Sequence, residues 1–208
     1  MRDLDEWGRL LDWSRAVADL ALPDSAVGQL KRYVETLLTW NRKVALVAQR
    51  ELSSILDKHV ADSLFVAAHC RGAQRVADLG SGAGFPGLVI GIVCPDLSVT
   101  LIEARGKKVS FMEEACRAAG IRNATPLHGR IEAIGADPDH RSRYDRITSR
   151  ALADLDVLGG LARPFAAPGG RLLAMRSSGS PVPDGAECAS YVLPDGTPRS
   201  LVTIALGN

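Results

Sequence analysis

The sequence lacks the features that mark several classes of protein. Its four cysteines, Cys70, Cys94, Cys116 and Cys188, lie far apart and form no C-x-x-C pair, so we expect neither a disulfide framework nor a metal site. No apolar run reaches the roughly 20 residues of a membrane span. The first residues also lack the basic and apolar segments of a secretory signal. These absences predict a soluble, cytoplasmic protein.

The chain also lacks an excess of charge of either sign. Its 25 Lys and Arg residues nearly balance 24 Asp and Glu residues, which leaves a net charge of +1. Because there is no globally basic field, a nucleic acid partner would have to be bound by local clusters of cations. The length of 208 residues suits one α/β domain with a modest extension.

Glycine, in contrast, is concentrated in one informative stretch. The apolar segment 75–79 is followed by Gly80, Gly82 and Gly84, and then by a second apolar segment at 88–93. This pattern predicts a buried strand, a tight turn and a helix. Glycines permit positive φ and let a ligand lie directly on backbone N–H groups at the start of the helix. The stretch therefore predicts a nucleotide or nucleoside site.

Two acidic residues favour one ligand over another. Gly82, Gly84 and Gly87 also fit the G-x-G-x-x-G spacing of dinucleotide-binding proteins, which keeps an NAD-dependent oxidoreductase as an alternative. However, Asp78 precedes the glycines, where a carboxylate would repel a pyrophosphate but attract the ammonium group of S-adenosylmethionine. Glu103 ends the next predicted strand and is placed to hold both ribose hydroxyls. The pair favours S-adenosylmethionine as the cofactor.

The chain divides into a helical part and an alternating part. Helices are expected at 4–22, 26–40 and 51–70, so residues 1–72 are predicted to form a helical extension packed on a methyltransferase domain at 73–208. Strands are expected at 75–79, 98–103, 124–128, 144–149, 170–175, 189–193 and 200–206, and further helices at 85–94, 107–119 and 154–166. The short turn at 194–198 allows only an antiparallel hairpin. This is the α/β architecture of the class I S-adenosylmethionine-dependent methyltransferases, a Rossmann-like, mostly parallel seven-stranded sheet.

Motifs in a fixed order extend from about residue 30 to residue 176. They include Trp40-Asn41, His59-Val-Ala-Asp62-Ser63-Leu64, Asp78-Leu-Gly80-Ser-Gly82-Ala-Gly84-Phe85-Pro86-Gly87, Glu103-Ala-Arg-Gly-Lys107-Lys108, Gly129-Arg130-Ile131-Glu132 and Ser149-Arg150-Ala151. With them the chain resembles the guanine-N7 methyltransferases of 16S ribosomal RNA, also called glucose-inhibited division protein B. The resemblance implies methylation of 16S ribosomal RNA in the small ribosomal subunit, with S-adenosylmethionine as cofactor.

The resemblance also implies roles for the matching cofactor-binding residues. Gly80 and Phe85 would line the methionine and sulfonium part of the cofactor. Glu103 would hold the ribose, while Ile131 and Glu132 would meet the adenine.

The remaining matched residues would lie over the site. Arg150 would face cofactor and substrate at the end of the fourth strand, and His59 and Asp62 would belong to a helix above it. Arg150, by positioning the reactants, and His59 are the candidate catalytic residues. Other interpretations stay open, since a lone histidine on an apolar helix often has a packing role. Arg150 could likewise form a structural ion pair with Asp78 or Asp154.

Two departures from the family pattern leave the substrate open. Ala45-Leu46-Val47 stands where the family has polar residues, and Arg176-Ser177 replaces a Lys-Gly pair before a segment that cannot form a helix. The alternatives are a methyltransferase of another RNA or of a small molecule, and a catalytically silent RNA-binding or nucleoside-binding relative. We expect a monomer.

Overall fold

Seven strands form a single sheet in the computed structural model, which describes residues 2–150 and 153–206. The strands are β1 (Arg75–Leu79), β2 (Ser98–Glu103), β3 (Ala124–His128), β4 (Tyr144–Arg150), β5 (Ala166–Ser177), β6 (Glu187–Val192) and β7 (Pro198–Ala205). Their order is β3-β2-β1-β4-β5-β7-β6. Strand β7 runs against its neighbours, β5 and β6. The predicted mostly parallel sheet with a C-terminal hairpin is confirmed.

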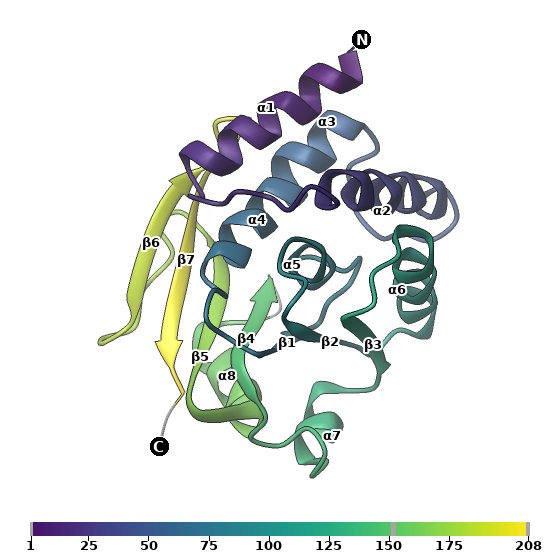
Figure 1. Ribbon diagram of the computed structural model, residues 1–208. Helices are drawn as coiled ribbons and strands as arrows, with labels where there is room; N and C mark the ends of the chain where they lie inside the picture. Colours follow the sequence, from purple (N-terminus) through teal and green to yellow (C-terminus); the bar gives the residue numbers. More distant parts are fainter. Residues whose placement is uncertain (1, 151–152, 207–208) are drawn as a thin grey trace.

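Helices cover both faces of this sheet (Figure 1). They are α1 (Arg2–Ala16), α2 (Ala26–Asn41), α3 (Leu52–Ile55), the π-helical turn η1 (Leu56–Val60), α4 (Ala61–Ala68), α5 (Gly87–Val93), α6 (Gly106–Ala119), α7 (Ile131–Ala136), α8 (Leu155–Ala162) and the 3-10 turn η2 (Arg163–Phe165). Within the described ranges, none of them combines the length and apolarity needed to cross a lipid bilayer.

The first four helices share one apolar core with the sheet. This core joins Leu10 of α1, Leu30 of α2 and Leu64 of α4 to Val76 of β1 and Leu101 of β2. A second core on the other face packs α8 and η2 against β4 and β5. Because burial of apolar surface drives folding, the helices at the start of the chain are held by the same force as the sheet.

Helices α2 and α6 pack against each other, and the contacts at their two ends show that they run antiparallel. At one end of the pair, Gln29 and Arg32 of α2 donate to backbone carbonyls at the end of α6. At the other end, the rings of Trp40 and Phe111 meet edge to face at 5.8 Å. The C-terminal end of α2 therefore lies beside the N-terminal half of α6.

Several element boundaries differ from those predicted. Helix α1 ends at Ala16, not at residue 22, because Ser14 donates a hydrogen bond to the carbonyl of Leu20 and Asp19 adopts a positive φ of 46°. The predicted helix at 51–70 contains the π-helical turn η1 and ends at Ala68. Helix α7 was not predicted, since six residues give too short a periodic pattern.

The connection between β5 and β6 has no helix across residues 178–186, all of which the structure describes. Its glycines and prolines predict this, because proline lacks the N–H that a helix interior needs. The departing pair Arg176-Ser177 is at the end of β5, directly before this connection. The guanidinium of Arg176 donates to the carbonyl of Ala153 at 3.0 Å.

Candidate active site

A cleft of about 530 Å³ opens at the carboxyl ends of the central parallel strands. It lies where the strand order reverses between β1 and β4, the usual ligand position in an open α/β sheet. Its volume is within the range of small-molecule and cofactor sites. Six of the predicted site residues line it: Gly80, Gly82, Glu103, Ile131, Glu132 and Arg150.

The glycine turn forms the floor of this cleft. Gly80, Gly82 and Gly84 have φ values of 71°, 59° and 87°, as the sequence predicts for this turn. A Cβ on Gly82 would have only the Gly80 carbonyl oxygen and the Lys108 amine nearby, each at 3.8 Å. A Cβ on Gly84 would instead collide with Leu88 at 2.4 Å. Gly82 therefore leaves open space for a ligand, whereas Gly84 permits close packing of the helix.

Asp78 lies beneath the turn and not in the cleft. Its side chain is fully buried, and its two oxygens accept hydrogen bonds from the Gly87 backbone N–H at 3.1 Å and from the Thr148 hydroxyl at 3.0 Å. Burial raises the pKa of this carboxyl to about 6. The position differs from the expected contact with a ligand ammonium: the carboxylate joins β1 to β4 and to the start of α5.

Glu103 borders the cleft with its carboxylate directed at the turn. One oxygen accepts from the backbone N–H of Gly82 at 3.0 Å and the other from that of Arg105 at 2.8 Å. A carboxylate oxygen can accept more than one hydrogen bond. The side chain can therefore also accept from a diol bound in the cleft, and its ribose role stays a prediction.

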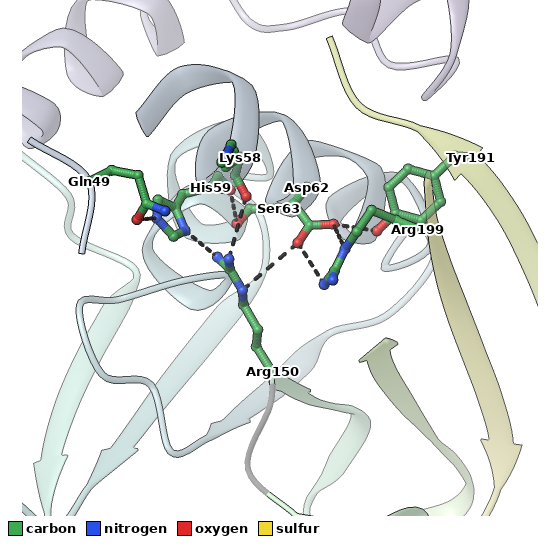
Figure 2. Close-up of polar contacts among 8 residues, drawn as sticks. All are labelled: Gln49, Lys58, His59, Asp62, Ser63, Arg150, Tyr191 and Arg199. Atoms are coloured by element: carbon green, nitrogen blue, oxygen red, sulfur yellow. Dashed lines mark hydrogen bonds and ion pairs between the residues drawn. The ribbon is translucent and has the colours of Figure 1, made fainter. Parts of the chain in front are cut away.

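Arg150 extends from the end of β4 toward η1 and α4 (Figure 2). Its guanidinium donates to the Nδ1 atom of His59 at 2.6 Å and lies 3.8 Å from a carboxylate oxygen of Asp62. The structure thus pairs Arg150 with Asp62, not with the expected Asp78 or Asp154. Because Arg150 also lines the cleft, these contacts fix a cation at its mouth.

His59 is held neutral in one tautomer by its partners. Arginine can only donate, so Nδ1 accepts from Arg150 and the proton is on Nε2, which donates to the side-chain oxygen of Gln49 at 2.7 Å. Burial and the nearby charge of Arg150 lower the pKa of the imidazole to about 3. The ring also stacks on Phe85, with centroids 5.1 Å apart. His59 therefore orients Arg150 and has no free lone pair for proton abstraction.

Asp62 is the fully buried centre of the same cluster. Besides Arg150, it receives hydrogen bonds from the Tyr191 hydroxyl on β6 and from Arg199 on β7, whose Nη2 atom is 3.1 Å away (Figure 2). Two guanidiniums around one carboxylate offset the cost of burying its charge. The C-terminal hairpin thereby supports the residue that holds Arg150.

Phe85 and Tyr33 connect the helical part to the turn. The Phe85 side chain is buried between the rings of His59 and Tyr33, so it does not contribute to the cleft lining where it was expected. The Tyr33 hydroxyl donates to the Ala83 carbonyl within the turn at 2.6 Å. Helix α2 and the turn are thus joined directly.

Sequence reasoning missed Gln49, Tyr191 and Arg199. Tyr191 and Arg199 lie far from the motifs along the chain and reach the site only through tertiary packing. Gln49 lies between two of the motifs, but no pattern in the sequence pointed to its contact with His59. In the part of the chain that the structure describes, no group of three or more His, Cys, Asp or Glu residues is arranged to hold a metal ion.

The protein-family comparison matches residues 26–182 to the family described as rRNA small subunit methyltransferase G. The chain belongs to this family. The resemblance drawn from the motifs is therefore confirmed. The matched range includes α2, the His59 cluster, the glycine turn and Arg150, so both walls of the cleft lie within it.

Curated relatives carry the same name. The ribosomal RNA small subunit methyltransferase G of Chloroflexus aggregans is 38% identical over 80% of this chain and 70% of its own length. That of Streptococcus sanguinis is 33% identical over 89% of this chain and 85% of its own length. These alignments extend beyond the motifs quoted above.

Solved structures have the same fold, and one of them is a methyltransferase by name. A SAM-dependent methyltransferase from Aquifex aeolicus aligns with a TM-score of 0.53 at 16% identity, covering 72% of this chain and 92% of its own. A variant of MtNAS in complex with S-adenosylmethionine aligns with a TM-score of 0.55 at 15% identity, covering 86% and 72%. The expected class I methyltransferase fold is confirmed.

Proposed function

We propose that this protein transfers a methyl group from S-adenosylmethionine to N7 of a guanine in 16S ribosomal RNA of the small ribosomal subunit. The observation that carries the proposal is the cleft of a family member, in which Gly80, Gly82 and Glu103 face Arg150 across open space. The names of the relatives indicate ribosomal RNA of the small subunit as the substrate, and the cleft is the place proposed for the cofactor.

The residues of the cleft fit S-adenosylmethionine. The open space above Gly82 accommodates a chain of methionine size, and Glu103 offers carboxylate oxygens to the ribose. Ile131 and Glu132, at the start of α7, form the wall on which adenine would lie. When bound, the cofactor supplies an electrophilic methyl group on a sulfonium. Asp78 and Phe85 serve indirectly by holding the turn.

Methylation of guanine N7 suits the residues that the structure describes around Arg150, which position groups but supply no nucleophile or general base. N7 has an in-plane lone pair and carries no proton, so the enzyme needs neither a nucleophile nor a general base. His59, whose lone pair is engaged by Arg150, acts as a positioning residue. Arg150 orients the substrate, and the rate gain comes from alignment of the reacting atoms.

The sequence departures do not favour another substrate. Of the departing residues 45–47, Leu46 is buried and Val47 packs against the same core, while Ala45 is exposed, and none of the three lines the cleft. We further propose that the protein acts as a monomer in the cytoplasm. Among the residues whose burial the structure describes, the exposed large apolar side chains are few and come from different segments: Val17, Val157, Val182 and Val192.

Methyl transfer from labelled S-adenosylmethionine tests the proposal. The acceptors are small subunits from a strain in which this gene is deleted, and 16S RNA stripped from them. We expect label in the RNA at a guanosine that becomes cleavable by aniline after borohydride treatment. Label at a position that aniline does not cleave would contradict N7, and absence of label with both acceptors would overturn the function. Gly82→Val serves as the inactive control.

A further inference from the structure

A second hollow, of about 340 Å³, lies between the end of α2 and the loop that follows it. It is lined by Leu38, Asn41, Arg42 and Arg50. Both arginines are exposed, and neither forms an ion pair within residues 2–150 and 153–206. Two unpaired guanidiniums lining one concave surface are suited to an anion with several acceptor oxygens.

The loop that carries Arg50 is folded firmly by one side chain. The amide oxygen of Asn41 accepts from the backbone N–H groups of Leu46 and Val47, at 2.9 and 3.1 Å. Its amide nitrogen donates to the carbonyls of Val47 and Gln49, at 3.0 and 3.1 Å. These four bonds fix the shape of the loop from within the chain, and such preorganisation lowers the cost of binding.

The same loop reaches the catalytic cleft through hydrogen bonds. Gln49, next to Arg50 in sequence, accepts from His59, and His59 accepts from Arg150 at the cleft mouth (Figure 2). The antiparallel packing of α2 and α6 gives the same placement, because the C-terminal end of α2 lies beside the start of α6, where Lys108 lines the cleft. The hollow and the cleft are therefore at one end of the molecule.

Other positively charged side chains lie at the same end of the molecule as this hollow. Lys43 follows Arg42, and Arg105, Lys108 and Arg130 line the cleft itself. None of these four has an ion pair in the described part of the chain. In a chain with a net charge of only +1, this local excess of unpaired cations is the footprint expected for a nucleic acid backbone.

We propose that the hollow lined by Arg42 and Arg50 binds a backbone phosphate of the RNA that flanks the target guanine. The inference rests on the proposed function for its RNA substrate. The contact positions the RNA and carries no sequence information, because phosphates are alike at every nucleotide. Asn41 is the positioning residue of this contact, since it shapes the loop.

Binding of stripped 16S RNA to Arg42→Gln/Arg50→Gln tests the proposal, measured by filter binding over a series of salt concentrations. The matched control is Arg141→Gln/Arg163→Gln, which removes two arginines from a hollow at the opposite end of the sheet. We expect the first variant to raise Kd about tenfold at low salt and to reduce the salt slope by roughly one to two. The control variant should match the wild type.

Calorimetric titration with S-adenosylmethionine separates a lost phosphate contact from misfolding, and both variants should bind the cofactor as the wild type does. An unchanged RNA affinity in the first variant, or an equal loss in the control, would overturn the proposal. Weaker binding to assembled subunits but not to stripped RNA would also overturn it, in favour of a protein partner. Failure of the proposed function is distinguishable, because it would appear as absent methyl transfer by the wild type.

Discussion

The sheet has a hollow at each end, and the two are nearly equal in volume but differ in construction. The carboxyl-end cleft, about 530 Å³, is built from positive-φ glycines, the buried Glu103 and the braced Arg150. The amino-end hollow, about 540 Å³, is lined by Arg141, Arg163 and the turn at Gly169. Volume therefore does not identify the site. Backbone N–H groups and buried carboxylates held by other residues distinguish the carboxyl end.

The largest expected effect is a loss of stability, and it compares a carboxylate at the carboxyl end of the sheet, Asp62, with one at the amino end, Asp145. Asp62 is fully buried and receives two guanidiniums and a hydroxyl, so Asp62→Ala leaves buried charges without a partner. We expect the free energy of unfolding to fall by about 3–5 kcal/mol. Asp145, at the amino end, accepts from the Gln74 and Arg75 backbone N–H groups near solvent. Asp145→Ala should cost only about 1–2 kcal/mol. Urea unfolding of both variants measures the difference, and equal losses would refute the contrast.

The next effect is a loss of cofactor binding, and it compares a glycine at each end of the sheet. Gly82 and Gly169 both have positive φ, and at each of them the place that a Cβ would take has no other atom within 3.4 Å, so valine strains both alike. Gly82→Val also fills the cleft, and we expect S-adenosylmethionine binding to weaken about 100-fold or more, a cost of about 2.7 kcal/mol. Gly169→Val should bind the cofactor normally. Calorimetric titration of both decides, and normal binding by Gly82→Val would place the cofactor elsewhere.

Glu103→Ala gives a graded test of the same cleft. It removes the proposed acceptor of the ribose hydroxyls and the acceptor of the Gly82 N–H. We expect cofactor affinity to fall by about 1–3 kcal/mol, the scale of hydrogen bonds to a charged group. The exposed Glu187, which pairs with Arg171 on the hairpin side, is the control, and Glu187→Ala should leave affinity unchanged. An unaltered Kd for Glu103→Ala would remove Glu103 from the ribose.

The last effect is the pH dependence of stability, which should weaken when His59 is replaced. The pKa of His59 is lowered to about 3, below the roughly 6.5 of an exposed histidine. Its contribution to stability is therefore complete above about pH 6.5 and is lost as pH falls toward about 3. His59→Asn keeps an acceptor for Arg150 but cannot titrate there, so its stability should decline less over this range. Thermal unfolding from about pH 7 to pH 4 measures this, and a decline equal to that of the wild type would exclude His59 as its source.

The sequence was most informative where local rules apply. Apolar runs and glycines predicted β1, β2 and β3 with the observed bounds and the positive φ of Gly80 and Gly82. Periodicity was least informative where tertiary contacts decide, as at the early end of α1 and the π-helical turn that carries His59. A turn of this kind depends on the packing of neighbouring segments.

In the candidate site too, features set by local sequence were predicted and features set by tertiary packing were not. Gly82 was predicted from the glycine turn and Glu103 from the end of a strand, while Arg150 was implied by the family resemblance; the structure gathers all three at the cleft. The burial of Asp78 and the turning of Phe85 toward His59 could not be predicted, since both depend on which face of the turn the helices cover. Tyr191 and Arg199 reach Asp62 only because the hairpin returns along the sheet.

A crystal structure with S-adenosylhomocysteine, the product form of the cofactor, tests the central claim most directly. We expect the ligand in the carboxyl-end cleft, with its ribose on Glu103 and its adenine against Ile131 and Glu132. The hollow beside Arg141 and Arg163 should contain none of it. A ligand bound at the amino end, or one in the cleft with its ribose away from Glu103, would contradict the claim.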